Sequence, residues 1–567
     1  MVMRQSIRES GVFLRRCWHL AAPFWRSRAR IKVGGMLAVA MAFNIANVYL
    51  TIRLNTWSKD FFNAMENKDG DEFMYQLGLL FGLAAIGLFL YANQKYLCDK
   101  AVQMWRGWLS ENYTERWLET KLYYRAVFRK SIDNPDQRIA EDLYLFPKLT
   151  VAMVFDFVDS FGSLGAFAVI LWGLSEAYTI NGVYIPGFML WITVGFVIVG
   201  TWLVHRIGHR LIGLERRRQE YEADYRSALI RLRDRAKDIA LHGGEDREAV
   251  VTKASFARVF DIWVKNLLKK RQLNYFNSGY AQASGVVPYL LAAPKYFSGA
   301  FQMGELMQTV SAFNGMRVSL SWFILNYSVL AEWKAVVDRL TEFDALLRER
   351  DMESPFARLE SRDGGLHINP MHLEFPDERI TGRDVVFSLM PGERVALTGP
   401  SGSGKTTLLY ALRGLWPFGR GRVEVPEGRQ LFLTQTPYLP TAPLSDVLSY
   451  PDSSLRISRE RCREILSLVE LEHLAESGEA GAAWDKTLSS GEQQRLAFGR
   501  IWAQRPDWVF LDEALSCVDP ACRERILRRL HADFPSMSVL SVEHYGADSP
   551  FYERQIDITA AAQEGGH

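Results

Sequence analysis

The residues best suited to chemistry form a glycine-rich run that matches the phosphate-binding pattern G-x-x-x-x-G-K-[ST] in full. The residues expected to bind phosphate are Gly399, Pro400, Ser401, Gly402, Ser403, Gly404, Lys405, Thr406 and Thr407. Glycines let backbone N–H groups turn toward anionic oxygens, and the N-terminus of a following helix adds its positive dipole end. Lys405 is expected to reach the β- and γ-phosphates, and the Thr406 hydroxyl to bind Mg²⁺. The run predicts binding of a nucleoside triphosphate rather than a chance glycine-rich turn.

A pair of carboxylates supplies the second part of the predicted site. Residues 508–511 are apolar and predict a strand, and Asp512 and Glu513 follow it directly. Asp512 would hold Mg²⁺, and Glu513 is placed to polarise an attacking water. Residues 394–398 also predict a buried strand, so the glycine-rich run is expected between a strand and a helix. These features predict hydrolysis of the bound triphosphate.

Several further short motifs occur in the order found in ATP-binding cassette (ABC) ATPases, which this part of the chain resembles. Residues 488–494, Leu-Ser-Ser-Gly-Glu-Gln-Gln, are similar to the signature of that family. The other matching positions are Gln435 for the Q-loop, Asp519 for the D-loop, His544 for the switch histidine and Phe375 for the aromatic residue that stacks on adenine. The resemblance implies ATP and Mg²⁺ as cofactors. It also implies that Glu513, His544 and Gln435 take part in catalysis, with Gln435 near the metal as well.

The same resemblance implies a head-to-tail pair of cassettes that encloses two ATP molecules. Ser489 and Gly491 would then donate to the γ-phosphate in trans, and Asp519 would lie beside the nucleotide. The commonest signature of the family has Gly where this chain has Ser490, and Gln where it has Glu492. Because serine has a Cβ atom, a strongly positive φ at position 490 would carry strain. These two departures are therefore expected to change the rate of ATP hydrolysis, and they do not affect the resemblance to ABC ATPases.

Length and charge limit the class of protein. A chain of 567 residues is expected to form two or three domains. The net charge of +2 argues against a nucleic-acid partner, which would require concentrated basic patches. The cysteines lack metal-binding spacing, which fits a reduced cytosolic setting for the cassette. Cys517, beside the D-loop, is expected to be a small buried residue rather than a redox sensor.

The N-terminal half contains apolar stretches long enough to cross a bilayer. Residues 1–32 are basic and contain aromatic residues, which predicts an amphipathic segment on the cytoplasmic membrane face, with a disordered basic tail as the alternative. Six spans are predicted, at residues 33–52, 74–92, 149–175, 182–204, 272–294 and 306–331. An even number of spans and a basic N-terminus place the N-terminus and the ATP-binding domain in the cytoplasm.

Domain boundaries follow from these features. We expect a cytoplasmic segment, a transmembrane domain with cytoplasmic helix extensions, a linker, an ABC ATP-binding domain and a disordered tail, at residues 1–32, 33–347, 348–365, 366–559 and 560–567. Residues 134–142 and 239–245 are predicted to be coupling elements between the membrane helices and the cassette, with ordinary solvated helix ends as the alternative.

The resemblance extends over nearly the whole chain. Residues 55–64, 134–142 and 287–299 are similar to the BacA/SbmA-related membrane domain, and the whole chain resembles the bacterial YddA-like half-transporters. The cassette also resembles that of peroxisomal fatty-acyl transporters. The resemblance implies a membrane α-helical domain with six spans, type IV ABC exporter-like, fused to an α/β P-loop ABC nucleotide-binding domain. It further implies a multi-pass homodimer in the lipid bilayer of the bacterial inner membrane.

The function implied is ATP-driven movement of peptides or other hydrophilic solutes, most simply uptake, because the BacA/SbmA-related group is associated with uptake. Export, lipid or acyl-chain transport and a non-transporting regulatory ATPase are the alternatives. Arg317 falls within the sixth predicted span, where a lipid-facing arginine would cost at least about 2.5–3.5 kcal/mol. We therefore expect Arg317 to face a wet cavity or an acidic partner, Asp156 or Asp159. A substrate-cavity role and a structural ion pair both remain open for these residues.

Overall fold

The computed structural model describes residues 2–125, 135–175, 179–180, 183–322, 326–348, 355–375, 384–476, 483–544 and 547–559. The chain divides into two compact units. The first comprises Met1–Arg116 and Asn134–Ala345, and the second comprises Trp117–Asp133 and Leu346–His567. The predicted tail, residues 349–354 of the predicted linker and position 134 of the first predicted coupling element lie outside the described residues.

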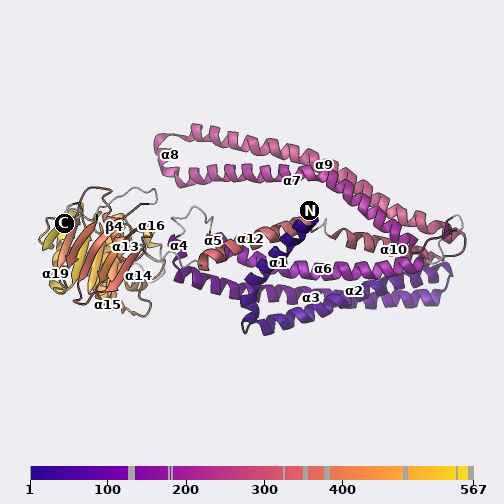
Figure 1. The fold of residues 1–567 in the computed structure, drawn as a ribbon, viewed down its shortest axis with the longest axis horizontal. Coiled ribbons are helices and arrows are strands. Elements are labelled where there is room, and N and C mark those ends of the chain that lie inside the picture. The colour runs from indigo at the N-terminus through magenta and orange to yellow at the C-terminus, as the bar shows by residue number, and fades with distance from the viewer. Residues whose placement is uncertain are drawn as a thin grey trace. The chain divides into compact units, whose positions relative to one another are not determined.

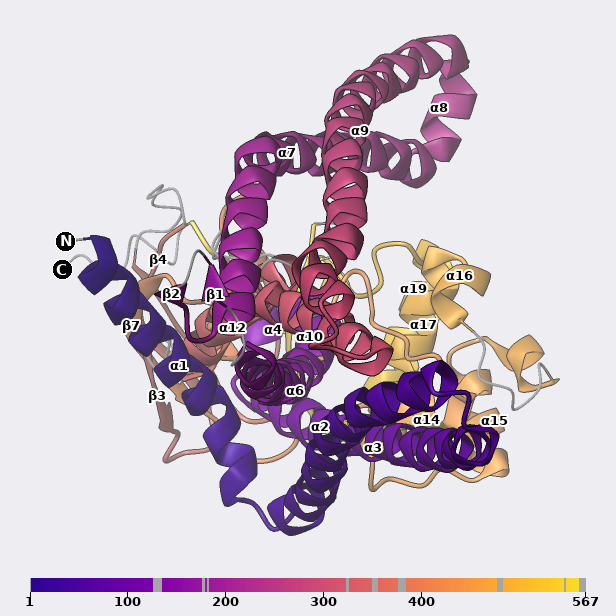
Figure 2. The same ribbon diagram turned by 90° about the vertical axis from the view of Figure 1, so that its right-hand side faces the viewer.

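Long helices make up nearly all of the first unit, as Figure 1 shows. Its elements are α1 (Val2–Arg26), α2 (Arg30–Glu66), α3 (Gly70–Glu119), α5 (Pro135–Gln137), η2 (Arg138–Asp142), α6 (Leu143–Leu174), β1 (Thr179–Ile180), β2 (Val183–Tyr184), α7 (Phe188–Asp234), α8 (Ala236–His242), α9 (Glu245–Phe297), α10 (Met303–Leu320) and α12 (Tyr327–Arg348). Figure 2 shows α7 and α9 running side by side with the short α8 joining their ends.

Four helices in the described part of the chain are long and apolar enough to cross a membrane. They are Arg30–Glu66, Gly70–Glu119, Pro135–Leu174 and Phe188–Gly208. The other two predicted spans are also helical, within α9 and α10, and α10 packs against α2, α6, α7 and α9. The helix α10 ends at Leu320, well before the predicted end of the sixth span at position 331.

The N-terminus of α10 is fixed to the end of α2 by backbone hydrogen bonds. The N–H of Gly304 donates to Asn63 Oδ1 at 2.7 Å, and the N–H of Met303 donates to Glu66 Oε2 at 2.6 Å. These bonds satisfy donors that the first turn of a helix leaves without intrahelical partners. Segments far apart in the sequence are thereby joined at one end of the helical unit.

The N-terminal segment is helical and has two distinct faces. On one face of α1, Cys17, Leu20 and Phe24 are buried, and the Phe24 ring lies 5.3 Å from the Trp105 ring of α3. On the other face, Leu14 and Trp18 are exposed. This arrangement matches the amphipathic segment expected from the sequence, because one apolar stripe packs on the protein while the other is left uncovered.

Two buried aspartates hold α12 against the rest of the first unit. Asp142 accepts hydrogen bonds from Arg138 Nη1 at 3.1 Å and from Arg339 Nε at 2.8 Å. Asp344 accepts from Tyr113 Oη at 3.2 Å and from Arg116 Nη1 at 2.9 Å. Buried charges are tolerated only when paired and hydrogen-bonded, and here both acceptors have cationic donors.

The first predicted coupling element lies within the first unit, and its coupling role stays a prediction. Residues Pro135–Asp142 form α5 and η2 and belong to the first unit, at the start of α6. The segment Trp117–Asp133 instead belongs to the second unit, and its short helix α4 (Leu122–Arg125) places Tyr124 edge-on to Tyr410, with ring centroids 6.4 Å apart. The proline turn at Pro135 suggested a rigid tip, but the buried Asp142 ties that turn to the membrane helices.

The second unit contains two sheets. In its described residues, a four-stranded sheet has the order β3-β7-β4-β5, and a five-stranded parallel sheet has the order β11-β6-β10-β9-β8. The strands are β3 (Phe356–Glu360), β4 (Leu366–Leu373), β5 (Val385–Leu389), β6 (Arg394–Thr398), β7 (Gly419–Val425), β8 (Gln430–Leu433), β9 (Trp508–Asp512), β10 (Ser538–Val542) and β11 (Arg554–Asp557).

The helices of the second unit pack against its strands in two hydrophobic clusters. Apart from α4, they are α13 (Lys405–Leu412), α14 (Leu444–Ser449), α15 (Arg459–Leu468), η3 (Glu472–Glu476), α16 (Trp484–Thr487), α17 (Ser490–Phe498), α18 (Arg500–Gln504) and α19 (Pro520–Asp533). In the parallel sheet, Leu397 pairs with Val542, and Val542 pairs with Asp512. The carboxyl ends of β6, β10 and β9 therefore meet at one edge, which is where α/β sheets bind ligands.

Candidate active site

The glycine-rich run forms the loop between β6 and α13, as its pattern predicts. Gly399, Gly402 and Gly404 have φ of 142°, 79° and 94°, a range that side chains with a Cβ atom avoid. The Ser403 Oγ atom is buried and has no hydrogen-bond partner among the described residues. A loop of this shape, with an unsatisfied buried hydroxyl and the N-terminus of α13, suits an anionic ligand.

The Lys405 side chain lies within this loop. Its Nζ donates to the carbonyl oxygens of Gly399 at 2.7 Å and Pro400 at 3.0 Å. Burial lowers the pKa of the Lys405 ammonium, while the nearby carboxylates of Glu513 and Asp512 act in the opposite direction. The acceptors that Lys405 now has are neutral carbonyl oxygens. Phosphate oxygens are charged and accept stronger hydrogen bonds, so they could replace these carbonyls.

Thr406 and Asp512 form the part of the site that could hold a divalent cation. Thr406 Oγ1 donates to Asp512 Oδ1 at 2.9 Å, so a hydroxyl from α13 meets a carboxylate from the end of β9. Burial raises the pKa of the Asp512 carboxyl, and the hydrogen bond from Thr406 opposes that change. Oxygen donors of these two types are those that Mg²⁺ prefers, usually together with phosphate oxygens and water.

The three residues expected to act in catalysis come together around one carboxylate. Gln435 Nε2 donates to Glu513 Oε2 at 3.1 Å, and His544 Nε2 lies 3.1 Å from Glu513 Oε1. Glu513 has a φ of 49°, which is uncommon for a residue with a side chain. Its N–H donates to the carbonyl oxygen of Val542 at 3.2 Å, which holds this backbone between the ends of β9 and β10. Unusual backbone held by its surroundings is typical of active sites.

The other predicted nucleotide contacts lie at different points of the second unit. Phe375 is half-buried after β4 and meets Trp416 edge-on, with ring centroids 5.8 Å apart. Ser401 is exposed on the loop and Thr407 is buried in α13. Asp519 caps α19, since its Oδ1 accepts from the N–H of Cys522 at 3.0 Å. The roles predicted for these residues toward ATP remain predictions.

Ser490 does not have the positive φ that would strain a serine at this position. Ser490 is the first residue of α17 and is not among the residues with positive φ. Ser489 caps this helix, and its N–H and Oγ–H donate to Glu492 Oε2 at 2.9 and 2.6 Å. These bonds from Ser489, helped by His473, lower the pKa of Glu492. A serine followed three residues later by glutamate is a capping box, so Ser489 and Glu492 together stabilise the start of α17.

Replacing Ser490 with glycine should therefore change little. We expect hydrolysis to stay within about threefold of wild type, and α17 to lose stability by about 0.5–1 kcal/mol because glycine weakens a helix. Steady-state ATPase rates and thermal unfolding of the two proteins test this. A large gain in rate for the Ser490→Gly variant would show that serine at this position does impede turnover.

Gly491 is required by the close approach of α17 to the D-loop. A Cβ atom at this position would lie 2.8 Å from the carbonyl oxygen of Cys517. Cys517 itself is exposed, so the expectation that it would be buried is wrong. The backbone carbonyl of Cys517 is the atom that α17 approaches at Gly491.

Gln494 received no role from the sequence, but the structure gives it partners in two of the predicted loops. It is buried in α17, and its Nε2 donates to the carbonyl oxygen of Gln435 at 2.8 Å and to Ser516 Oγ at 3.3 Å. Its Oε1 accepts from the N–H of Cys517 at 2.8 Å. One amide thus connects the Q-loop with the D-loop. The sequence could have pointed to Gln494 because it is a polar residue at a buried position of a predicted helix. Buried amides need specific hydrogen-bond partners.

The Gln494→Ala variant is expected to hydrolyse ATP about tenfold more slowly, because the Gln435 carbonyl and the Cys517 N–H lose a buried partner. ATP affinity should be nearly unchanged, since Lys405 and Thr406 are not in contact with Gln494. Hydrolysis and equilibrium ATP binding should be measured together. Gln493→Ala is the matched control, because Gln493 bonds the carbonyls of Asp485 and Leu488 instead. Equal losses of rate in both variants would contradict the role of Gln494.

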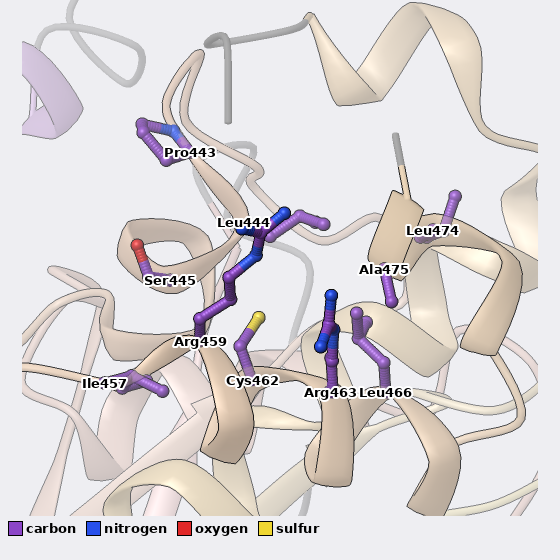
Figure 3. A pocket seen from close by; sticks show the side chains of 10 residues that line it. All are labelled: Pro443, Leu444, Ser445, Ile457, Arg459, Cys462, Arg463, Leu466, Leu474 and Ala475. Atoms are coloured by element: carbon purple, nitrogen blue, oxygen red, sulfur yellow. The ribbon is translucent and has the colours of Figure 1, made fainter. Parts of the chain in front are cut away.

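A separate hollow of about 400 Å³ lies in the helical region of the second unit. Figure 3 shows Arg459, Cys462 and Arg463 of α15 facing Pro443 and Leu444 across it. The residues that line it include none of the predicted site residues. It is therefore a feature distinct from the candidate active site.

The three residues predicted within the membrane do not form the expected pairs. Asp156 and Asp159 lie on α6, and Arg317 lies on α10. Among the described residues no ion pair joins Arg317 to either aspartate, and the Arg317 Nε atom is buried without a hydrogen-bond partner. Asp156 lines a cavity between α3 and α6, to which neither Arg317 nor Asp159 contributes.

Comparisons with known proteins agree with this architecture. Residues 23–297 match the family model described as ABC transporter transmembrane region 2, and residues 383–516 match that described as ABC transporter. The chain is 33% identical over 533 residues to the inner membrane ABC transporter ATP-binding protein YddA of Escherichia coli (strain K12), covering 93% of this chain and 94% of that protein.

More distant relatives are found in plants and animals. The chain is 28% identical to ABC transporter D family member 2, chloroplastic, of Arabidopsis thaliana, covering 96% of this chain and 86% of that protein. It is 24% identical to ATP-binding cassette sub-family D member 3 of Homo sapiens, and this match covers 78% of this chain and 72% of that protein. A solved structure of a bacterial Atm1-family ABC exporter with ATP bound has a TM-score of 0.72 at 17% identity, covering 94% of each chain, which shows a shared fold.

Proposed function

This chain belongs to the ABC transporter family, and on that premise we propose that it is a homodimeric half-transporter that moves peptides or other hydrophilic solutes across the bacterial inner membrane. Its cassette is an ATPase coupled to transport, carried by a membrane domain of apolar helices. The observation that carries the proposal is the meeting of Gln435 and His544 on the Glu513 carboxylate, beside the Thr406–Asp512 pair.

We propose Mg²⁺ as the second cofactor. Thr406 Oγ1 and Asp512 Oδ1 would hold it, and the buried Asp512 carboxylate already points at the hydroxyl. When bound, the ion would neutralise negative charge on the phosphates. Gln435 donates to Glu513 rather than to Asp512, so its proposed contribution to the metal site would require its side chain to turn.

Glu513 would accept a proton from the attacking water. A general base must lie within hydrogen-bond reach of the proton that it takes, so its orientation matters as much as its charge. Gln435 and His544 fix the two oxygens of this carboxylate from opposite sides, at 3.1 Å each. The Lys405 ammonium and the N–H groups of the loop would meanwhile hold the phosphates in place.

A second copy of the chain would complete the site. Ser489 and Gly491 lie at the start of α17, and Ser489 Oγ is hydrogen-bonded to Glu492 of the same chain. We propose that these residues meet the nucleotide bound to the partner cassette, which agrees with the pairing implied by the family resemblance. Because each site would need two chains, the rate of ATP hydrolysis per chain would rise with the concentration of the protein.

Uptake is the direction that we propose, and export is the alternative. The resemblance of the membrane domain to a group associated with uptake supports import, whereas the similar fold of an exporter supports the other direction. Charged side chains on the α3–α6 cavity favour a polar solute over a lipid or an acyl chain.

Growth of cells under a panel of toxic peptides tests this function. Cells that express the wild-type protein should become more sensitive than cells that express Glu513→Gln at the same level. Protection by the wild-type protein would indicate export instead. If neither protein changes sensitivity while lipid or acyl substrates stimulate the ATPase, the proposed solute class is wrong.

A further inference from the structure

A cavity of about 590 Å³ lies between α3 and α6 in the helical unit. Its volume is within the range of sites that hold small molecules, about 300–1,000 Å³. The two helices meet elsewhere through Trp105 and Phe146, whose ring centroids are 5.6 Å apart, and through Arg106, which lies 4.8 Å from the Tyr144 ring. The cavity is therefore bounded by contacts that keep the helices at a fixed separation.

Charges of both signs line this cavity. On the α3 wall, Lys95 Nζ lies 3.2 Å from Asp99 Oδ1, so these charges compensate each other. On the α6 wall, the charged residues are Lys148 and Asp156, and among the described residues neither takes part in an ion pair. Lys148 instead lies 5.2 Å from the Tyr144 ring. Across the cavity, Lys95 of α3 acts on the Asp156 charge from beyond ion-pair distance. The α6 wall thus presents one cation and one anion, neither of them held in an ion pair among the described residues.

The spacing of these two charges defines a length. Lys148, Ala152 and Asp156 recur every four residues and therefore lie on one face of α6, and all three line the cavity. Eight residues of helix span about 12 Å. An extended peptide covers at most about 3.3–3.6 Å per residue, so the ends of a chain of about three or four residues are this far apart.

Retaining these charges has an energetic cost. Asp156 falls about two turns inside the predicted third span, where a carboxylate is costly unless it meets water or a cation. Charged residues in such positions commonly line solute pathways. Between the two charges the wall is apolar, with Val151, Ala152 and Phe155, which suits small side chains or backbone.

We propose that this cavity binds short peptides by their two ends, with Asp156 accepting from the terminal ammonium and Lys148 donating to the terminal carboxylate. The inference rests on the proposed function, because it names a solute class and a site for the same transporter. Since Lys148 lies at the start of α6, before the predicted span, the carboxylate end of the peptide would face the cytoplasmic end of the cavity.

Binding of labelled trialanine to the full-length protein in lipid nanodiscs tests the proposal. N-acetyl-trialanine lacks the ammonium and trialanine amide lacks the carboxylate. For the wild-type protein, each blocked form should bind at least about tenfold more weakly, because each loses a charge-assisted hydrogen bond. Asp156→Asn should abolish only the preference for a free ammonium, and Lys148→Gln only the preference for a free carboxylate.

Lys100→Gln is the matched control on α3. Lys100 does not line the cavity and lies 5.5 Å from the ring of Tyr96, so this variant should keep both preferences. Equal binding of all three probes by the wild-type protein would overturn the proposal, and this comparison requires no variant to fold. Loss of both preferences in each variant would also overturn it, since the two ends would not be recognised separately.

Uptake of trialanine into vesicles separates this inference from the function on which it rests. If uptake depends on Glu513 but is the same in Asp156→Asn, Lys148→Gln and wild type, the cavity is not the site although the protein transports peptides. If no hydrophilic probe is bound or transported while acyl lipids stimulate hydrolysis, the proposed function fails together with the site.

Discussion

Replacing Glu513 with glutamine is expected to lower the rate of ATP hydrolysis by at least about a hundredfold, because glutamine cannot accept a proton from the attacking water. The amide can still bond Gln435 and His544, which lie 3.1 Å from the two oxygens, so the local structure should be preserved. ATP affinity should be nearly unchanged, since Lys405 and Thr406 are intact. Phosphate release under saturating ATP and equilibrium binding of labelled ATP measure the two effects.

Glu464→Gln provides the matched control for this experiment. Glu464 lies on α15 of the same unit, is exposed, and pairs with Arg461 at 2.9 Å, away from the candidate active site. Its substitution should leave both hydrolysis and ATP binding at wild-type values. Hydrolysis by Glu513→Gln within about threefold of wild type would remove Glu513 from the role of general base.

Removing the Asp142 side chain is expected to destabilise the helical unit by about 3 kcal/mol, because it leaves Arg339 and Arg138 as unpaired cations in a largely buried position. The Asp142 side chain is 3% exposed, whereas that of Arg339 is 35% exposed. Arg339 can therefore recover part of its hydration, so the expected loss lies at the lower end of the range of about 3–5 kcal/mol for breaking a buried ion pair. A lower thermal unfolding temperature and a lower yield of monodisperse protein in detergent would show this for Asp142→Ala.

Asp338→Ala is the control on the same helix as Arg339. Asp338 pairs with Arg16 at 2.7 Å, but the two side chains are 40% and 48% exposed. Exposed ion pairs contribute about 0–1 kcal/mol, so this substitution should have little effect on unfolding. Similar losses for Asp142→Ala and Asp338→Ala would mean that burial does not determine the contribution of these pairs.

Short motifs made most of the active site predictable. A phosphate-binding loop depends on neighbouring residues, so Gly399 to Thr406 could be recognised directly, and the strand–loop–helix order around them was confirmed. The fold class was also predictable, because long apolar stretches and a cassette pattern each have a distinct composition. The comparisons confirm the family and the fold.

Errors arose where a residue's environment comes from a distant segment. At the proline turn near Pro135, nothing in the sequence indicated that Arg339, about two hundred positions away, binds Asp142 and holds this region in the helical unit. The expected strain at Ser490 followed from the family pattern, whereas the capping box between Ser489 and Glu492 gives this residue ordinary helical backbone. Cys517 is exposed, while its backbone N–H donates to the buried Gln494.

Residue types and short spacings were enough to predict a phosphate loop, a metal-binding pair and a general base, and to identify apolar helices able to cross a membrane. These depend on residue type and short spacing, which local structure preserves. Only the tertiary structure decided which side chains share a site. It placed Gln435 and His544 on Glu513, connected the two loops through Gln494, and set Lys148 and Asp156 on one cavity wall. The reason is physical, since hydrogen bonds and ion pairs depend on distances of about 3 Å between atoms that the folded chain alone brings together.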